Sequence, residues 1–158
     1  MTASALPSNP CTAPEDAPLC VRRDARGVVT LTLNDSARFN ALGSEMLAAL
    51  QQALDAIAQD DSVRVVVLAG AGKAFCAGHN LKDMAAHPEL AWYQQLFAQC
   101  NRMMLSIHKL PVPVIARVQG MATAAGCQLV AQCDLAVASE GTTFSTSGIH
   151  YSRFCATP

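Results

Sequence analysis

Several features that mark other protein classes are scarce or missing in this sequence. The 158 residues include 7 cysteines but no C-x-x-C pair, so the sequence suggests neither a disulfide framework nor a metal site such as zinc. Charged residues make up only 15% of the chain and the formal net charge is −1, which leaves no basic surface for nucleic acid or an anionic membrane. No apolar run approaches the roughly 20 residues of a membrane-spanning helix. We therefore expect partners that are small molecules or other subunits, with no nucleic acid and no membrane.

The N-terminal 20 residues differ in composition from the rest of the chain. They hold half of the prolines among small polar residues, a composition that buries too little apolar surface to fold. Residues 1–20 are therefore predicted to be a disordered tail. The tail has no apolar run of signal-peptide length, and Glu15 and Asp16 argue against a mitochondrial transit peptide. These features, with the cysteine pattern, predict a cytoplasmic protein.

Beyond the tail, strand and helix patterns alternate. Strands are predicted over residues 28–33, 64–69, 114–118 and 134–138, and helices over residues 44–59, 90–107 and 124–132. The continuously apolar run at 64–69 is typical of a strand that is buried on both faces. This alternation predicts an α/β layered domain with right-handed crossovers.

Ligands of such sheets bind beyond the carboxyl ends of the strands, which directs attention to the Gly- and Ala-rich loops at 70–80 and 119–126. Nucleotide-binding glycine motifs fail in the first loop, because Phe75 and Val67 stand where they need glycine. Cys76 and His79 are three residues apart, but no third group that would orient a nucleophile and its base is identifiable.

Backbone N–H groups are the remaining candidates for chemistry. The turn at 77–79 and the helix start at 124–126 both expose such groups. Two of them aimed at one point would form an oxyanion hole, which stabilises negative charge on a carbonyl oxygen. The spacing of these residues favours neither interpretation, because the two segments could equally well be close-packed turns without a chemical role.

Two segments carry a family resemblance. Residues 73–84 (KAFCAGHNLKDM) and residues 119–129 (QGMATAAGCQL), continued by CDLA at 133–136, resemble the two signatures of the crotonase (enoyl-CoA hydratase/isomerase) superfamily, as do FNAL at 39–42 and PVPVIA at 111–116. Within the superfamily the chain is most similar to the enoyl-CoA hydratase domain-containing protein 3 subgroup. The resemblance implies a ClpP/crotonase spiral of ββα units, with residues 21–158 as the N-terminal part of a crotonase-like domain.

The same resemblance implies that the C-terminal helical part of the fold is missing from this sequence. A layered sheet that lacks its covering helices exposes apolar surface, so we expect impaired folding or association. Full-length members of the superfamily are expected to be homotrimers or hexamers.

The resemblance further implies an acyl-CoA ligand in fatty-acid metabolism, with coenzyme A as part of the substrate and no separate cofactor. The thioester carbonyl would lie between the backbone N–H groups of His79 and Ala125. The CoA site would be lined by Ala77, at the adenine end, and by His79, Asn80, Leu81 and Lys82. Ala125 replaces the usual glycine, and the hole survives if the turn needs no positive φ there.

The chain departs from the superfamily at the positions of the two hydratase glutamates, which are Gln128 and Gly148 here. An amide and a glycine cannot act as general base or acid. His79, Cys127 and His150 are candidate substitutes, and no spacing favours any of them. An enoyl-CoA hydratase/isomerase and a non-catalytic acyl-CoA-binding or subunit-interaction module therefore stay open. A thioesterase-like hydrolase that uses Cys76 is a third alternative.

Overall fold

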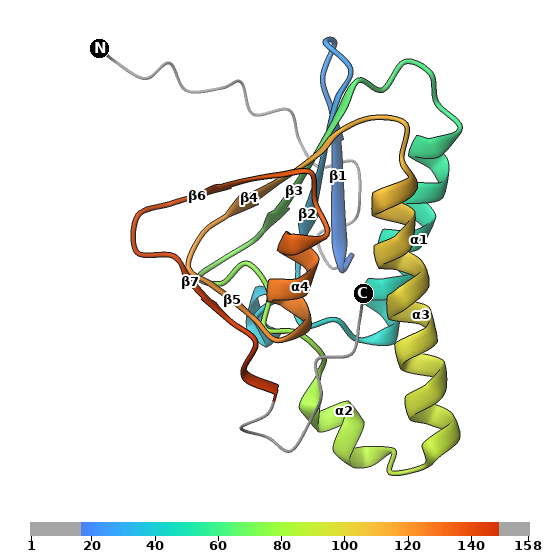
Figure 1. Cartoon of the computed structure of the whole chain (residues 1–158), viewed down its shortest axis with the longest axis vertical. Coiled ribbons are helices and arrows are strands. Elements are labelled where there is room, and N and C mark those ends of the chain that lie inside the picture. The colour runs from blue at the N-terminus through green and yellow to red at the C-terminus, as the bar shows by residue number, and fades with distance from the viewer. Residues whose placement is uncertain (1–16, 149–158) are drawn as a thin grey trace.

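The computed structural model describes residues 17–148 (Figure 1). Its elements in chain order are β1 (Leu19–Arg23), β2 (Val28–Leu33), a 3-10 turn (Ser36–Arg38), α1 (Ser44–Ala58), β3 (Val65–Gly70), α2 (Leu81–Ala86), α3 (Leu90–Lys109), β4 (Val114–Val118), β5 (Met121–Thr123), α4 (Ala125–Ala131), β6 (Leu135–Ala138) and β7 (Thr143–Ser145). Every helix and strand expected from the sequence is present. The strands β1, β5 and β7 and the short helix α2 are additions.

The predicted tail overlaps the first strand. Leu19 and Cys20 begin β1, which pairs antiparallel with β2, while residues 1–16 of the predicted tail lie outside the described residues. Cys20 is disulfide-bonded, although the cysteine spacing suggested no disulfide framework. Among the described residues the free thiols are those of Cys76, Cys100, Cys127 and Cys133.

The main sheet has the strand order β1-β2-β3-β4-β6, and β2, β3, β4 and β6 run parallel. A second, two-stranded parallel sheet joins β5 and β7. Parallel neighbours need helical crossovers, which α1 and α3 supply between β2, β3 and β4. This arrangement confirms the predicted α/β class.

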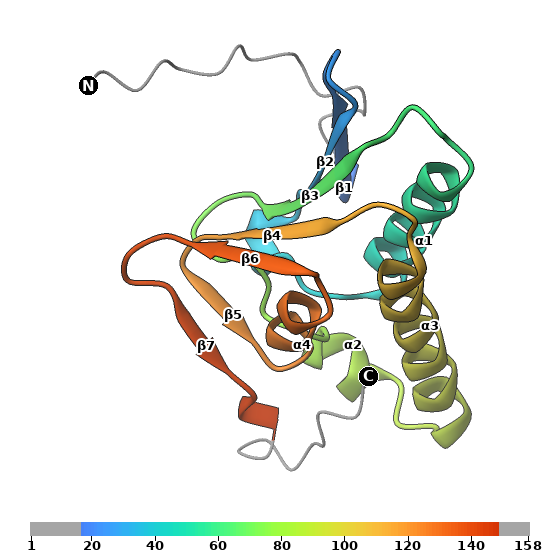
Figure 2. The same ribbon diagram turned by 45° about the horizontal axis from the view of Figure 1, so that its top comes forward.

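Helices α1 and α3 lie side by side against one face of the sheet (Figure 2). Helix α1 buries Leu47, Leu50, Leu54 and Ile57 at the spacing seen in the sequence. Helix α3 ends at Lys109, shortly before Pro111, because proline cannot continue a helix. Strand β3 alternates, with Val66 and Leu68 buried and Val65 and Val67 half-buried. No residue of β3 is exposed, so one face of this strand is buried and the other is partly buried.

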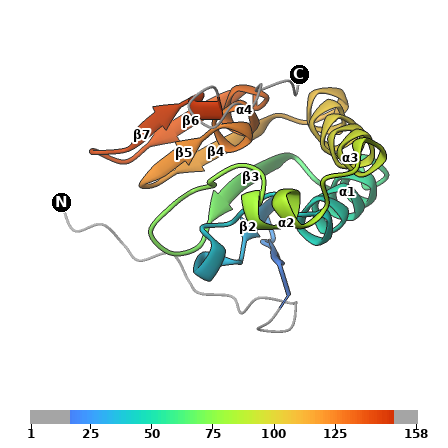
Figure 3. The ribbon, with the colours of Figure 1, turned by 90° about the horizontal axis from the view of Figure 1, so that it is seen from below.

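The edge of the fold formed by β6 and β7 is exposed. In the view from below these strands lie at the end of the molecule away from α1 and α3 (Figure 3). All residues of β6 and β7 are exposed, including Leu135 at 61% and Val137 at 63%. The expected uncovered apolar surface is thus present on these strands.

Candidate active site

The loop before α1 is fixed to the loop after β3 by Asn40. Its side chain is fully buried, and its Nδ2 donates to the carbonyl oxygens of Ala71, Ala74 and Phe75 at 2.9, 2.8 and 3.1 Å. Its Oδ1 accepts from the Asp35 N–H at 2.9 Å. Asn40 has a φ of 54°, a left-handed conformation that asparagine tolerates better than most residues. One side chain thus holds the two loops together.

The loop after β3 also runs alongside β5. The N–H of Phe75 donates to the Met121 carbonyl at 2.9 Å, and the N–H of Thr123 donates to the Cys76 carbonyl at 3.0 Å. Cys76 and Ala122 form a parallel bridge. The two signature segments, far apart in the sequence, are therefore neighbours.

The turn at 77–79 and the start of α4 touch at Gly78. A Cβ added to Gly78 would lie 3.0 Å from both the backbone nitrogen of Ala125 and the Cβ of Ala124, and Gly78 has a φ of +83°. A Cβ on Gly126 would lie 2.3 Å from the Cys76 carbonyl oxygen. These positions require glycine, and their close contact brings the two predicted turns together.

The N–H groups of His79 and Ala125 donate to no acceptor within residues 17–148. Ala125 is the first residue of α4 and is 3% exposed. The positive φ of this segment, 50°, is at Ala124, whose N–H donates to the Ser145 carbonyl at 2.8 Å. Ala125, which replaces the usual glycine, therefore keeps its backbone N–H. The strained left-handed conformation is that of Ala124.

The side chain of His79 is enclosed beside this turn. Its Nδ1 lies 3.1 Å from the Leu42 carbonyl oxygen, and its ring meets the Phe97 ring edge-on at 5.3 Å between centroids. Burial holds the pKa of His79 below its usual value, although the contact with Leu42 opposes this. Nε2 is buried and has no hydrogen-bond partner among the described residues, 17–148.

The residues expected to line the CoA site occupy different environments. Asn80 is the N-cap of α2, and its Oδ1 accepts from the Lys82 N–H at 3.1 Å, a role that suits asparagine and aspartate equally. Ala77 is half-buried and its N–H donates to the Phe39 carbonyl at 3.0 Å. Leu81 and Lys82 are exposed on α2.

The positions of the missing glutamates lie close to the same turns. Gln128 is half-buried on α4, three residues after Ala125. Gly148 is buried and follows Ser147, whose hydroxyl lies 2.7 Å from that of Thr123. The fold therefore brings both positions to the region of Ala125, and neither supplies a carboxylate. His150 lies outside the described residues.

Cys76 is fully buried, and this raises the pKa of its thiol to about 12. Its sulfur accepts a hydrogen bond from the Gly78 N–H at 3.4 Å. Because the thiolate is the nucleophile, the environment of Cys76 argues against the hydrolase alternative.

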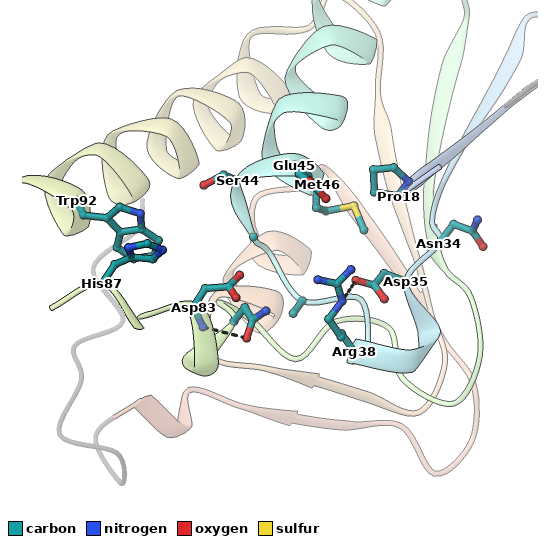
Figure 4. A pocket seen from close by; sticks show the side chains of 13 residues that line it. Pro18, Asn34, Asp35, Arg38, Ser44, Glu45, Met46, Asp83, His87 and Trp92 are labelled. Carbon is teal, nitrogen blue, oxygen red and sulfur yellow. Dashed lines mark hydrogen bonds and ion pairs between the residues drawn. The ribbon is translucent and has the colours of Figure 1, made fainter. Parts of the chain in front are cut away.

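A polar cavity of about 420 Å³ lies between the 3-10 turn, α1 and α2 (Figure 4). Three carboxylates line it, from Asp35, Glu45 and Asp83. Among the described residues that line the cavity, Arg38 is the only lysine or arginine, and it forms an ion pair with Asp35 at 2.9 Å. A lining of this charge disfavours the diphosphate of CoA.

Comparisons with known proteins give the family. Residues 23–156 match the sequence profile of the enoyl-CoA hydratase/isomerase family. The chain belongs to the enoyl-CoA hydratase/isomerase family. A family member from Xenopus laevis, named enoyl-CoA hydratase domain-containing protein 3, mitochondrial, is 42% identical over 141 residues, which are 89% of this chain and 48% of that protein.

Solved structures of the enoyl-CoA hydratase/isomerase family show the same fold. The crystal structure of an enoyl-CoA hydratase from Mycobacterium smegmatis has a TM-score of 0.87 and 60% identity, covering 88% of this chain and 54% of that one. The human enoyl-CoA hydratase domain-containing protein 3 structure has a TM-score of 0.84 and 38% identity, covering 89% and 55%. The crotonase-like fold is thus confirmed, and the chain spans about half the length of these relatives.

The family relatives also correct one prediction. The similar proteins from Xenopus laevis, rat and human are all named mitochondrial. The prediction of a cytoplasmic protein is therefore wrong. It relied on the cysteine pattern and on the composition of the first 20 residues, including Glu15 and Asp16, and neither observation excludes a mitochondrial protein.

Proposed function

We propose that this chain binds acyl-CoA thioesters and holds the thioester carbonyl oxygen between the backbone N–H groups of His79 and Ala125. The observation that supports the proposal is the close approach of Gly78 to the Ala125 nitrogen, together with N–H groups of His79 and Ala125 that donate to no acceptor within residues 17–148. Helix α4 has only seven residues, so the donors themselves, rather than the helix dipole, supply the stabilisation. An oxyanion-hole donor typically contributes about 2.7–4 kcal/mol to stabilising the transition state.

In this proposal coenzyme A enters as part of the substrate, in fatty-acid metabolism. Ala77 lies at the adenine end of coenzyme A, and the phosphates of coenzyme A approach the exposed Lys82. Asn80 and Leu81 present the start of α2 to the same ligand. A homotrimer or hexamer stays a prediction, which sedimentation velocity tests.

Saturable binding tests the proposal, with free CoA and butyryl-CoA titrated in a calorimeter. Ala125→Pro removes one donor, and the first position of a helix tolerates proline. Denaturant unfolding checks that the variant is folded, because proline restricts the backbone of the preceding Ala124, which has a φ of 50° and a ψ of −126°. We expect the folded variant to bind butyryl-CoA at least about tenfold more weakly, while binding of free CoA changes less. Equal binding of the thioester by both proteins would exclude a role for the Ala125 N–H.

A non-catalytic acyl-CoA-binding or subunit-interaction module is the second candidate, and the absence of carboxylates at Gln128 and Gly148 favours it. Turnover of crotonyl-CoA separates the candidates. A module binds crotonyl-CoA without hydrating or isomerising it. A rate well above background, lost in Ala125→Pro, identifies an enzyme and excludes the module.

A further inference from the structure

Another cavity lies where three parallel strands of the main sheet end. Strands β3, β4 and β6 run side by side and finish at the same edge (Figure 2). A cavity of about 510 Å³ lies at that edge, and residues that line it include Gly70, Arg117, Gln119 and Ser139. Ligands of parallel sheets usually bind beyond this edge. Neither His79 nor Ala125 lines the cavity, so it is separate from the proposed oxyanion hole.

Arg117 is the charged group of this cavity. It is exposed on β4, next to Ala69 of β3 and Val137 of β6. It forms no ion pair with any residue in the described range 17–148, and none of the described residues that line the cavity is acidic. The cavity of Figure 4 differs, because three carboxylates line it and its arginine is paired. The guanidinium of Arg117 is therefore available to an anion.

Two backbone donors accompany Arg117. The N–H groups of Gly72 and Gln119, both lining residues, donate to no acceptor within residues 17–148. The Gln119 side chain donates from Nε2 to the Gly70 carbonyl oxygen at 2.6 Å, and this bond ties the segment after β4 to the end of β3. Val137 also lines the cavity and is 63% exposed. The cavity thus combines a cation and backbone donors with an apolar wall.

These donors and the size of the cavity favour one class of ligand. A guanidinium binds carboxylates and phosphates, and backbone N–H groups in a turn with a left-handed residue favour phosphate. Gly72, with a φ of +75°, is such a residue. A volume of about 510 Å³ is within the range of small-molecule sites, about 300–1,000 Å³, so the cavity suits a whole molecule rather than a free ion.

We propose that this cavity binds a small phosphate monoester. The phosphate group lies at Arg117 and the N–H groups of Gly72 and Gln119, and the apolar part of the ligand lies against Val137. This second site goes beyond the proposed function, because it uses neither of the two donors of the oxyanion hole.

Calorimetry with phenyl phosphate tests the inference. We expect saturable binding by the native chain and at least about tenfold weaker binding by Arg117→Gln, which removes the charge. Arg117→Lys keeps the charge without the guanidinium fork and should lose less. Arg102→Gln is the matched control, because Arg102 is also exposed and forms no ion pair with a described residue, but lies on α3. Its affinity should equal that of the native chain, and denaturant unfolding checks that each variant is folded.

Lys82→Gln separates this site from the proposed coenzyme A site, where Lys82 meets the phosphates. Weaker binding of phenyl phosphate in Lys82→Gln, with native affinity in Arg117→Gln, would place the probe at the coenzyme A site and overturn the inference. Absence of binding by the native chain would also overturn it.

Two further probes test the class of ligand. Benzoate lacks the phosphate and inorganic phosphate lacks the apolar group, so both should bind more weakly than phenyl phosphate. Equal or tighter binding of either probe would overturn the assignment of a phosphate monoester. None of these outcomes affects the binding of butyryl-CoA, whose dependence on Ala125 tests the proposed function separately.

Discussion

A side chain on Gly78 would lie 3.0 Å from the backbone nitrogen of Ala125. This contact joins the loop after β3 to the start of α4, and it places the N–H of His79, the next residue, near that of Ala125. The geometry of the proposed hole therefore depends on a position where only glycine fits.

Gly78→Ala should destabilise the fold strongly. The new methyl group combines the strain of a left-handed backbone with a collision, and together these cost about 3 kcal/mol. Gly141→Ala is the matched control, because Gly141 has a similar φ of +80° but no atom within 4 Å of an added Cβ. It should lose only about 1 kcal/mol. Denaturant unfolding measures both losses, and similar values would show that the contact with Ala125 is unimportant.

Ala124→Gly should stabilise the protein. Ala124 is held at a φ of 50° and a ψ of −126°, a conformation that an alanine adopts at a cost and glycine adopts readily. We expect a gain of roughly 0.5–1 kcal/mol in the free energy of unfolding. Ala125→Gly, in the helix, should instead lose about 0.5 kcal/mol. Changes of opposite sign in the free energy of unfolding for these two variants would show that Ala124→Gly relieves strain. A change of the same sign in both would indicate a general effect of glycine.

The sequence predicted the long, periodic elements well because their signals are local. The spacing of Leu47, Leu50 and Leu54 identifies α1, and Pro111 limits α3. Strands β5 and β7 have only three residues each, which is too short for periodicity to appear, and they are stabilised by pairing with each other. Strand β1 was hidden because its residues follow a proline-rich segment.

The candidate site was only partly predictable, because its key interactions connect residues distant in the sequence. The two N–H groups could be named from their loops, but their proximity depends on the contact of Gly78 with Ala125. The position of the strain, at Ala124 rather than Ala125, depends on how β7 holds the Ala124 N–H. The importance of Asn40 was missed, although asparagine after a turn is a signal for a left-handed residue.

Asn40→Asp should be among the most damaging isosteric changes. The carboxylate would face the carbonyl oxygens of Ala71, Ala74 and Phe75, to which Asn40 now donates, and a buried charge without a partner costs about 3–5 kcal/mol. Asn40→Ala, which only loses the bonds, should cost about 2–3 kcal/mol.

Acid separates the two variants. The buried carboxyl of Asn40→Asp should have a pKa above its unfolded value of about 3.9, and its protonated form can donate one hydrogen bond. As the pH falls toward that raised pKa, the loss in free energy of unfolding of Asn40→Asp should therefore become smaller relative to that of Asn40→Ala. Unfolding curves at several pH values test this, and a constant difference would contradict the proposed contacts.

His79 should make the folded chain sensitive to acid. Because burial lowers its pKa, the unfolded state binds more protons between the lowered value and the usual value of about 6.5. Stability should therefore fall as the pH drops through about 6.5, and this contribution should level off below the folded pKa. Urea unfolding of the native chain and His79→Phe at pH 8 and about pH 5.5 should show a smaller loss of stability in the variant, and equal losses would contradict the prediction.

The exposed face of β6 should cause self-association. Leu135 and Val137 point to the same side of the strand and are 61% and 63% exposed, and Phe144 on β7 adds a further apolar side chain that is 48% exposed. Contiguous apolar surface on an edge strand is prone to intermolecular contact, and lysine on such a strand opposes it.

Leu135→Lys should therefore shift the sedimentation distribution toward smaller species. Leu90→Lys is the matched control, because Leu90 is 73% exposed at the start of α3, away from β6, and its replacement should leave association unchanged. A chain that stays monomeric at every concentration would contradict the prediction. An equal effect of the two lysines would show that added charge, rather than the β6 surface, controls association.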